Sequence, residues 1–310
     1  MNKLFITVLG LIFLAPAVRA QDADSLLSSL DSSKYLGNQA SATFKSTRIV
    51  LSHSTETQKK YDLDLRIRHH FGDVGGNFGG SHTLYGLDVA TDLYIGFDYG
   101  LTDRLTLGIG RSKHNELFNF FAKQKAIGQS KGASPVTLTL LAQAGIITRE
   151  EEFENEFNDD STRTSYVFQA LISRKFSERL SVQISPTYLL RSLHVGTGDN
   201  QNLFSLGFAG RFKLSKRLSL VGDYQLVNAF GRPEGLFDHY FNPLGVGLEI
   251  ETGGHVFSLN FMNSEYIIEN SFIPDTQKSW NNGGVRFGFT MSRNFSLRKS
   301  KNPDIQSKIY

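Results

Sequence analysis

The sequence has 310 residues, of which 40% are hydrophobic and 20% are charged, and its formal net charge is +3. Because it contains no cysteine, disulfides, thiolate metal sites, a cysteine nucleophile and a lipidated N-terminal cysteine are excluded. Without Lys3 and Arg19, which belong to the leader described next, 31 basic residues stand against 30 acidic ones, a net charge of +1. A basic surface for nucleic acid or another polyanion is therefore not indicated.

Residues 1–20 have the pattern of a secretory signal peptide. Lys3 supplies the positive start, and the apolar run Leu4 to Leu14 is too short to cross a bilayer as a helix. Val18 and Ala20 are the small residues expected before a cleavage site at Gln21, with a second possible cut three residues earlier. An uncleaved anchor is the alternative, but a polar run rich in Ser and Asp follows at once. The pattern predicts export, and no later run of about 18 apolar residues predicts a transmembrane helix.

The segment 21–60 is predicted to be a periplasmic or luminal lead-in. Within it, the stretch Ala42 to Leu51 has strand-like spacing and would add a thirteenth strand to the twelve described below. Single-chain bacterial outer-membrane barrels have an even number of strands. We therefore expect twelve strands, with this stretch forming a plug or cap of the lumen.

Apolar residues recur at every second position along most of the chain from residue 61 onward. Such alternation predicts strands with one apolar and one polar face. In the first of them, Leu63, Leu65 and Ile67 share one face, while charged residues occupy the other. The twelve predicted strands are Asp62–Phe71, Leu87–Tyr99, Arg104–Lys113, Phe118–Ile127, Pro135–Thr148, Thr164–Phe176, Leu180–Arg191, Asn202–Leu214, Leu218–Asn228, Leu244–Glu251, His255–Asn263 and Val285–Phe295.

The composition of the two faces favours a membrane over water. The polar faces carry Gly, Ser, Thr, Gln and charges of both signs, and the apolar faces are long and rich in aromatic residues. A soluble sandwich would bury one shared core, whereas a barrel in lipid needs an apolar outer face on every strand and tolerates a polar interior. Several runs hold about ten residues, the length that a tilted strand needs to cross a bilayer. The sequence therefore predicts an all-β, antiparallel transmembrane barrel over residues 61–297, followed by a basic tail over residues 298–310.

Turn sequences separate the predicted strands into two kinds of connection. Leu101–Thr106, Phe176–Ser181 and Leu214–Ser219 are similar tight turns, and Gly253-Gly254 suits a two-residue hairpin. The other connections are longer and irregular. Short turns on one rim and long loops on the other are typical of outer-membrane barrels, in which the short turns face the periplasm.

Charged residues on the polar faces are the candidate site of this protein. Functionally, they would line an aqueous pore and set its ion preference. Since both signs occur in similar number, an ion-pair network that fills and stiffens the barrel is the alternative that we favour. The residues are Asp64, Arg66, Arg68, Asp88, Asp92, Arg191, Arg211, Asp223, Glu249, Glu251 and Arg286.

Other candidate chemistry is weaker. His69 and His70 are neighbours on one strand, so they face opposite ways and cannot bind one metal ion. The pairs Ser52-His53 and Ser81-His82, and His114 beside Asn115, lack a nucleophile elbow of the Gly-x-Ser-x-Gly type. The acidic loop from Arg149 to Asp160 matches no calcium-binding spacing. We expect no catalytic, cofactor or metal site.

Four stretches resemble a bacterial family of membrane-bound β-barrel domains of unknown function. They are the runs Ala42–Val50, Asp64–Gly72, Gly86–Asp88 and Gly100–Ser112. The resemblance implies a barrel fold and a membrane location, and it carries over no catalytic residue.

Three functions follow from these observations. The first is a passive channel or uptake pore for small polar solutes in the outer membrane of a Gram-negative bacterium. The second is a closed structural or partner-binding barrel of the cell envelope, and an outer-membrane enzyme is the least supported. The expected partners are membrane lipid and either small polar solutes or envelope proteins. A water-filled lumen would separate the first function from the second.

Overall fold

The computed structural model describes residues 42–130, 132–154, 156–157, 160–191, 199–253 and 255–297. The predicted leader, its cleavage site, the part of the lead-in before residue 42 and the basic tail from residue 298 lie outside the described residues. So does Gly254 of the predicted two-residue turn. No helix in the described ranges is long and apolar enough to cross a membrane.

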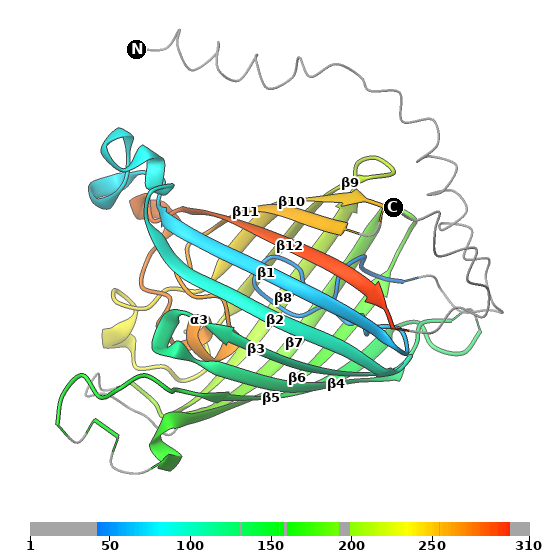
Figure 1. Ribbon diagram of the computed structural model, residues 1–310, viewed down its shortest axis with the longest axis horizontal. Helices are drawn as coiled ribbons and strands as arrows, with labels where there is room; N and C mark the ends of the chain where they lie inside the picture. Colours follow the sequence, from blue (N-terminus) through cyan, green and yellow to red (C-terminus); the bar gives the residue numbers. More distant parts are fainter. Residues whose placement is uncertain are drawn as a thin grey trace, which may run out of the picture. The chain divides into compact units, whose positions relative to one another are not determined.

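The described part of the chain forms twelve antiparallel strands that close into one barrel (Figure 1). Each strand pairs with the next along the chain, and β1 pairs with β12 to complete the ring. The predicted fold is confirmed, and each of the twelve predicted segments corresponds to one strand. The strands are β1 (Asp62–Asp73), β2 (Ala90–Thr102), β3 (Leu105–Ser112), β4 (Phe118–Ile127), β5 (Thr137–Ile146), β6 (Thr164–Lys175), β7 (Leu180–Arg191), β8 (Asn202–Lys213), β9 (Leu218–Leu226), β10 (Leu244–Thr252), β11 (His255–Met262) and β12 (Arg286–Ser296).

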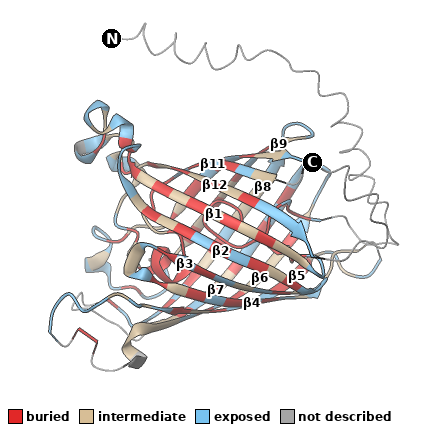
Figure 2. Cartoon of the chain, viewed as in Figure 1, coloured by how far each residue is buried: buried red, intermediate tan, exposed pale blue. Residues whose placement is uncertain are grey.

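Burial alternates along the strands as the period of two predicts (Figure 2). On β1, Asp64, Arg66 and Arg68 are almost fully buried because they point into the barrel. On β2, the outward residues Ile95 and Phe97 are 46% and 44% exposed. The outer wall is therefore apolar and the inner wall is largely polar, which is the arrangement that a bilayer requires.

The three similar turns are held by the same hydrogen bonds. In the β6–β7 turn, the hydroxyl of Ser177 accepts the backbone N–H groups of Arg179 and Leu180, at 3.2 and 3.1 Å. Thr102 in the β2–β3 turn and Ser215 in the β8–β9 turn accept in the same way from the residues two and three positions later. A hydroxyl at this position stabilises a tight turn. The five longer connections predicted from the sequence lie together at the other rim, between β1 and β2, β5 and β6, β7 and β8, β9 and β10, and β11 and β12.

The start of the second predicted strand needs a correction. Pairing of β2 begins at Ala90, and Asp88 lies in the preceding loop with an exposed side chain. The cause is Gly86, which has a φ of 83° and ends a short 3-10 turn, so that the backbone enters the sheet later than the alternation suggested. Asp88 is therefore not a luminal residue, contrary to the prediction.

Two segments fill the barrel interior. The first is residues 42–58, here called the plug hairpin, whose two arms meet at an isolated bridge between Arg48 and His53. The second is the helix α3 (Glu269–Asp275), which lies in the long β11–β12 connection (Figure 1). Ala42 to Leu51 is thus not a thirteenth wall strand, despite its spacing. It turns back on itself inside the lumen, where the side chains of the barrel wall satisfy its backbone.

Candidate functional site

The tip of the plug hairpin is a tight turn deep in the lumen. Ile49 N–H donates to the carbonyl of Ser52 at 2.9 Å, and Ser54 N–H donates to the carbonyl of Thr47 at 3.0 Å. Val50 and Leu51, at the tip, are fully buried. Their peptide groups need partners away from bulk water, because an unpaired buried N–H or carbonyl group is costly.

Asp223 on β9 supplies the acceptor for this turn. One carboxylate oxygen, Oδ2, accepts the backbone N–H groups of Val50, Leu51 and Ser52 at 3.2, 2.8 and 2.8 Å. Hydrogen bonds to an ionised acceptor are about twice as strong as neutral ones. A single wall residue therefore anchors the tip of the plug hairpin.

Cationic wall residues bind the carbonyl groups of the same hairpin. On β1, Arg68 donates to the carbonyl of Val50 at 2.6 Å and to the carbonyl of Ile267, beside α3, at 3.1 Å. On β4, Lys123 donates to the carbonyls of Thr47 and Ser54 at 3.2 and 3.3 Å. These wall side chains thus bind the hairpin mainly through its backbone groups.

Uncharged wall side chains complete the attachment. Gln183 on β7 donates to the carbonyl of His53 at 2.8 Å, and Thr139 on β5 donates to the carbonyl of Thr55 at 2.8 Å. The hydroxyls of Thr55 and Ser173 lie 2.6 Å apart. Each of these hydrogen bonds replaces hydrogen bonds that the same groups would make to water in the unfolded chain. The net stabilisation from each is therefore only about 1 kcal/mol.

The α3 segment is held to the wall from the long-loop side. Asp92 on β2 accepts the backbone N–H of Ile267 at 3.1 Å, just before the helix. The amide of Asn270 donates to Ser165 at 2.7 Å and accepts from Gln143 at 2.6 Å. The helix is thereby fixed across the barrel interior, between β2, β5 and β6.

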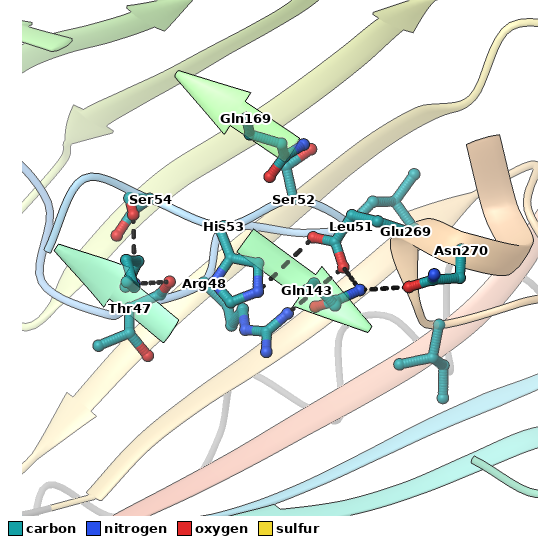
Figure 3. Close-up of polar contacts among 12 residues, drawn as sticks. Thr47, Arg48, Leu51, Ser52, His53, Ser54, Gln143, Gln169, Glu269 and Asn270 are labelled. Carbon is teal, nitrogen blue, oxygen red and sulfur yellow. Dashed lines mark hydrogen bonds and ion pairs between the residues drawn. The ribbon is translucent and has the colours of Figure 1, made fainter. Parts of the chain in front are cut away.

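The plug hairpin and α3 meet at a cluster of buried polar groups (Figure 3). Glu269 is the shared acceptor, and its carboxylate lies 3.6 Å from Arg48 Nη1 and 3.9 Å from His53 Nε2. Burial lowers the pKa of His53 well below 6.5, and nearby Arg48 lowers it further, so the imidazole is neutral at pH 7. These separations exceed those of direct hydrogen bonds. The plug hairpin is therefore bonded more closely to the wall than to α3.

Apolar side chains also join the two occupants. A buried cluster contains Phe44, Val50 and Leu51 of the plug hairpin together with Phe272 and Ile273 of α3. Inward-facing apolar wall residues extend this cluster: Val167, Leu189, Leu203, Val221 and Met262. The lumen thus has a charged sector and an apolar sector, and the apolar sector was not anticipated from a polar-inside rule.

The predicted luminal charges, apart from Asp88, lie on the inner side of the barrel or at its loop rim. Asp64 pairs with Arg66 at 2.5 Å, and Arg211 pairs with Glu249 at 2.9 Å. Others bind loops, the plug hairpin or another residue of the wall, rather than an open lumen: Arg68, Asp92, Arg191, Asp223, Glu251 and Arg286. An ion-pair and hydrogen-bond network describes the arrangement in this state.

The network also contains charged residues outside the predicted set, and four of these lie at or beside the plug hairpin and α3: Lys123, Asp98, Arg48 and Glu269. Lys123 and Asp98 lie on inward positions that strand parity already marks, and both are buried. Arg48 and Glu269 lie outside the strands, where no periodicity applies. Parity would have found the first two residues, whereas the last two meet only through the fold.

The histidine pair behaves as predicted. His70 points inward, with Nδ1 3.1 Å from the carbonyl of Glu265, while His69 packs outward beside Phe71 and Phe289. Among the residues that the structure describes, no three His, Asp or Glu side chains gather closely enough to hold a metal ion.

The nominal catalytic pairs are engaged in structural contacts. Ser52 accepts a hydrogen bond from Gln225 at 2.9 Å, whereas His53 faces Glu269. His114 stacks on Tyr266, with ring centroids 3.7 Å apart. In the acidic loop, Glu156 forms a two-oxygen ion pair with Arg149, which lowers the pKa of Glu156 to about 2.

Cavities lie on both sides of the filled section. The one toward the long loops has a volume of about 440 Å³, and Tyr266 and Asn270 are among its lining residues. The one toward the short turns has a volume of about 290 Å³ and is lined by Ser46, Asp64 and Arg66, among others. These two cavities share no lining residue, because the plug hairpin and α3 lie between them.

A match to one protein family agrees with the architecture. The sequence profile of a family described as a membrane bound beta barrel domain matches residues 44–295. None of the curated proteins matches the sequence. Among solved structures, the NanC porin is similar at 9% identity over 76% of this chain and 100% of that one, with a TM-score of 0.45. The KdgM porin is 8% identical over 76% and 99%, with a TM-score of 0.42. The outer membrane protein Omp33 of Acinetobacter baumannii is 10% identical over 76% and 99%, with a TM-score of 0.39.

Proposed function

The chain belongs to the family of membrane bound beta barrel domains, and from this premise we propose that it is an outer-membrane pore for small polar solutes, closed by the plug hairpin. In the closed state, residues 42–58 and α3 occupy the lumen. In the conducting state, the hairpin withdraws toward the short-turn rim, where its second arm joins β1. The predicted signal peptide supports delivery to the cell envelope.

The observation that carries this proposal is the contrast between the two interfaces of the plug hairpin. The hairpin makes many direct hydrogen bonds to side chains of the wall, and water molecules could take its place as partners of those side chains. Its polar contact with α3 is loose, with 3.6 Å between Arg48 and Glu269. Two occupants that enter from opposite rims and meet at a loose polar interface can separate without breaking the barrel.

Withdrawal would expose a wall suited to polar solutes. The inner faces of β1 and β2 would present Asp64, Arg66, Arg68 and Asp98, which are charges of both signs. Paired charges of this kind favour hydrated, polar solutes over apolar ones, and mixed signs avoid strong ion selectivity.

A disulfide between the plug hairpin and the wall tests the proposal. Thr55 and Ser173 touch through their hydroxyls at 2.6 Å, and the chain has no other cysteine to interfere with Thr55→Cys/Ser173→Cys. We expect discrete conductance steps in planar bilayers under reducing conditions and their loss after oxidation. Insertion is checked by heat-modifiable gel migration.

A second double-cysteine variant, placed within the barrel wall, is the control for effects of oxidation that do not involve the plug hairpin. Ser258 and Thr290 are register partners on β11 and β12 and face the lumen. In Ser258→Cys/Thr290→Cys, a disulfide would join wall to wall and leave the conductance unchanged. The pore proposal would be overturned if neither the wild-type protein nor the reduced Thr55→Cys/Ser173→Cys variant conducts after insertion into the bilayer.

A closed, partner-binding barrel is the second candidate, and the apolar cluster favours it. Phe44, Val50 and Leu51 pack against Phe272 and Ile273 inside the lumen, where withdrawal would expose them to water. Burying one such side chain stabilises by about 1.5–3 kcal/mol. On this alternative, the barrel stays closed, and neither the reduced nor the oxidised double variant conducts.

A further inference from the structure

The cavity at the long-loop rim combines side chains from several loops and from α3. Its volume of about 440 Å³ falls in the range of small-molecule sites, which is roughly 300–1,000 Å³. Asn270, Ser271, Pro274 and Asp275 bring α3 to its lining. A solute arriving from the loop side would therefore touch the helix that closes the lumen.

The charges around this cavity balance. His114 adds none at pH 7, because burial lowers its pKa to about 4. Each of two arginines already holds a carboxylate: Arg149 holds Glu156, and Arg191 holds Asp199 at 2.7 Å. The third arginine, Arg163, donates to the carbonyl of Arg149 at 2.7 Å and lies over the ring of Phe157 at 3.8 Å. An anion would find these guanidinium groups engaged, so the lining favours an uncharged ligand. The six charged lining residues are Arg149, Arg163, Arg191, Glu152, Glu156 and Asp275.

Aromatic and aliphatic side chains give the cavity apolar surfaces. Tyr266 is fixed by stacking on His114 at 3.7 Å, and Tyr240 is covered by the guanidinium of Arg232 at 4.1 Å. Leu117 and Ile147 also line the cavity. Rigid tyrosines offer a ring surface together with a polar tip, and they lose little conformational entropy on binding.

Asp275 is the least compensated carboxylate in this lining. Its carboxylate lies 3.8 Å from Arg191, whose closer partner is Asp199, and no nearer ion pair joins it among the described residues. Burial raises the pKa of Asp275 to about 6. A carboxylate kept at a cost in a cavity is often functional. Its two oxygens can accept from two adjacent hydroxyl groups at once.

We infer that this cavity binds an uncharged saccharide of about two rings, with Asp275 accepting from neighbouring hydroxyls and Tyr266 packing on a sugar face. Neutral polyols match the balanced charge, and ring C–H faces match the tyrosine and aliphatic surfaces. The inference deepens the proposed function and rests on it, since it names the class of solute that the pore would receive.

The position of α3 gives such binding a route to the plug hairpin. Asn270 lines the cavity, and the adjacent Glu269 faces Arg48 and His53 of the hairpin. A bound sugar would thus lie one residue away from the interface that keeps the lumen closed.

Isothermal titration of the full chain in detergent tests the inference without requiring conduction. The probes are maltose, cellobiose, lactose and an array of other neutral di- and trisaccharides, with the matching uronic acids and inorganic phosphate as charged comparisons. We expect saturable binding of at least one neutral saccharide. Asp275→Asn and Tyr266→Ala should each weaken it at least tenfold, whereas Tyr266→Phe should weaken it less.

Glu234→Gln is the matched control, because it removes an exposed carboxylate at the same rim that does not line this cavity. It should leave the affinity unchanged, and gel migration shows that each variant is folded. Binding of none of the neutral saccharides, preference for the charged probes, or equal affinity in Asp275→Asn would overturn the inference. A protein that binds sugar but never conducts would instead refute the pore and leave the site standing.

Discussion

Asp223 and Arg68 hold the same turn of the plug hairpin from different strands of the barrel. Asp223 accepts three successive backbone N–H groups of residues 50–52, and Arg68 donates to the carbonyl of Val50. The anionic side chain thus satisfies the N–H groups of the turn, and the cationic side chain satisfies one of its carbonyl groups. Because they recognise the backbone, the attachment depends on the wall residues more than on the sequence of the tip.

Replacement of Asp223 should release the hairpin. In Asp223→Ala, three buried N–H groups lose their acceptor, and each such loss costs about 1–3 kcal/mol. The closed state should weaken, and the open fraction in single-channel recordings should rise at least tenfold, which needs only about 1.4 kcal/mol. Asp223→Asn keeps one acceptor oxygen and should have a smaller effect.

Glu249→Gln provides the comparison for Asp223. Glu249 on β10 is also a buried inner-wall carboxylate, but its partner is Arg211 on β8, another residue of the wall. Its replacement should change stability without raising the open fraction. Equal gating by both replacements would show that general loosening of the wall, rather than the hairpin contact, controls conduction.

Arg48 and Glu269 should be energetically coupled. Glu269→Gln leaves the fully buried Arg48 without its charged partner, and breaking a buried ion pair in this way costs about 3–5 kcal/mol. The double variant Arg48→Met/Glu269→Gln should cost less than the sum of the single variants. Urea unfolding in lipid vesicles, followed by the fluorescence of the single tryptophan Trp280, measures each value.

Additivity in a second pair checks this coupling. Arg211→Met combined with Glu269→Gln should show no interaction energy, because Arg211 pairs with Glu249. Additive effects of Arg48 and Glu269 themselves would mean that the plug hairpin and α3 do not communicate through this contact.

Asp275→Asn should stabilise the protein at neutral pH. The pKa of Asp275 rises from 3.8 to about 6 through burial, so the native state favours the neutral carboxyl. Stability is therefore lost as pH rises from about 4 to about 6, and asparagine avoids this loss. Since the side chain is still 37% exposed, solvent screening limits the gain to about 1 kcal/mol. The melting temperature should rise by about 2–4 °C at pH 7.5 and not at pH 4.

Gly110→Ala should destabilise the barrel wall. A Cβ atom at Gly110 would lie 2.2 Å from the hydroxyl of Tyr94, whose ring covers this glycine and Gly96 on the paired strand. Overpacking of this kind costs about 1–3 kcal/mol. The penalty should shrink in a Tyr94→Ala background, as measured by the urea midpoint. Gly235→Ala places the same methyl group in open space and should have little effect.

The strands of the barrel wall could be predicted from the sequence because a strand in a lipid bilayer alternates between an apolar outer and a polar inner face. Each strand repeats every two residues, so parity assigned Asp64, Arg66 and Arg68 to the interior, as the structure shows. Even the irregular Phe118–Ile127 is a strand, although its inward Phe121 breaks the polar pattern. Phe121 is apolar because it packs edge-on against His53 of the plug hairpin, 4.8 Å away.

The contents of the lumen could not be read in the same way. Ala42 to Leu51 has the spacing of a strand, but its conformation depends on Asp223 and Arg68, which are remote in sequence. The helix α3 contains Pro274 and has seven residues, too few for a periodic signal. The candidate site was therefore found as a set of wall charges, without the two segments that those charges bind.

The two segments that fill the lumen are connected to the two strands that close the ring. The plug hairpin leads directly into β1, and α3 lies in the connection before β12, while β1 and β12 pair with each other. The pairing of β1 with β12 completes the ring, so its formation during biogenesis would bring the plug hairpin and α3 into the lumen. A chain delivered to the membrane in this order would be sealed from the moment its ring is complete, and the cell would be spared a transient leak while new copies assemble.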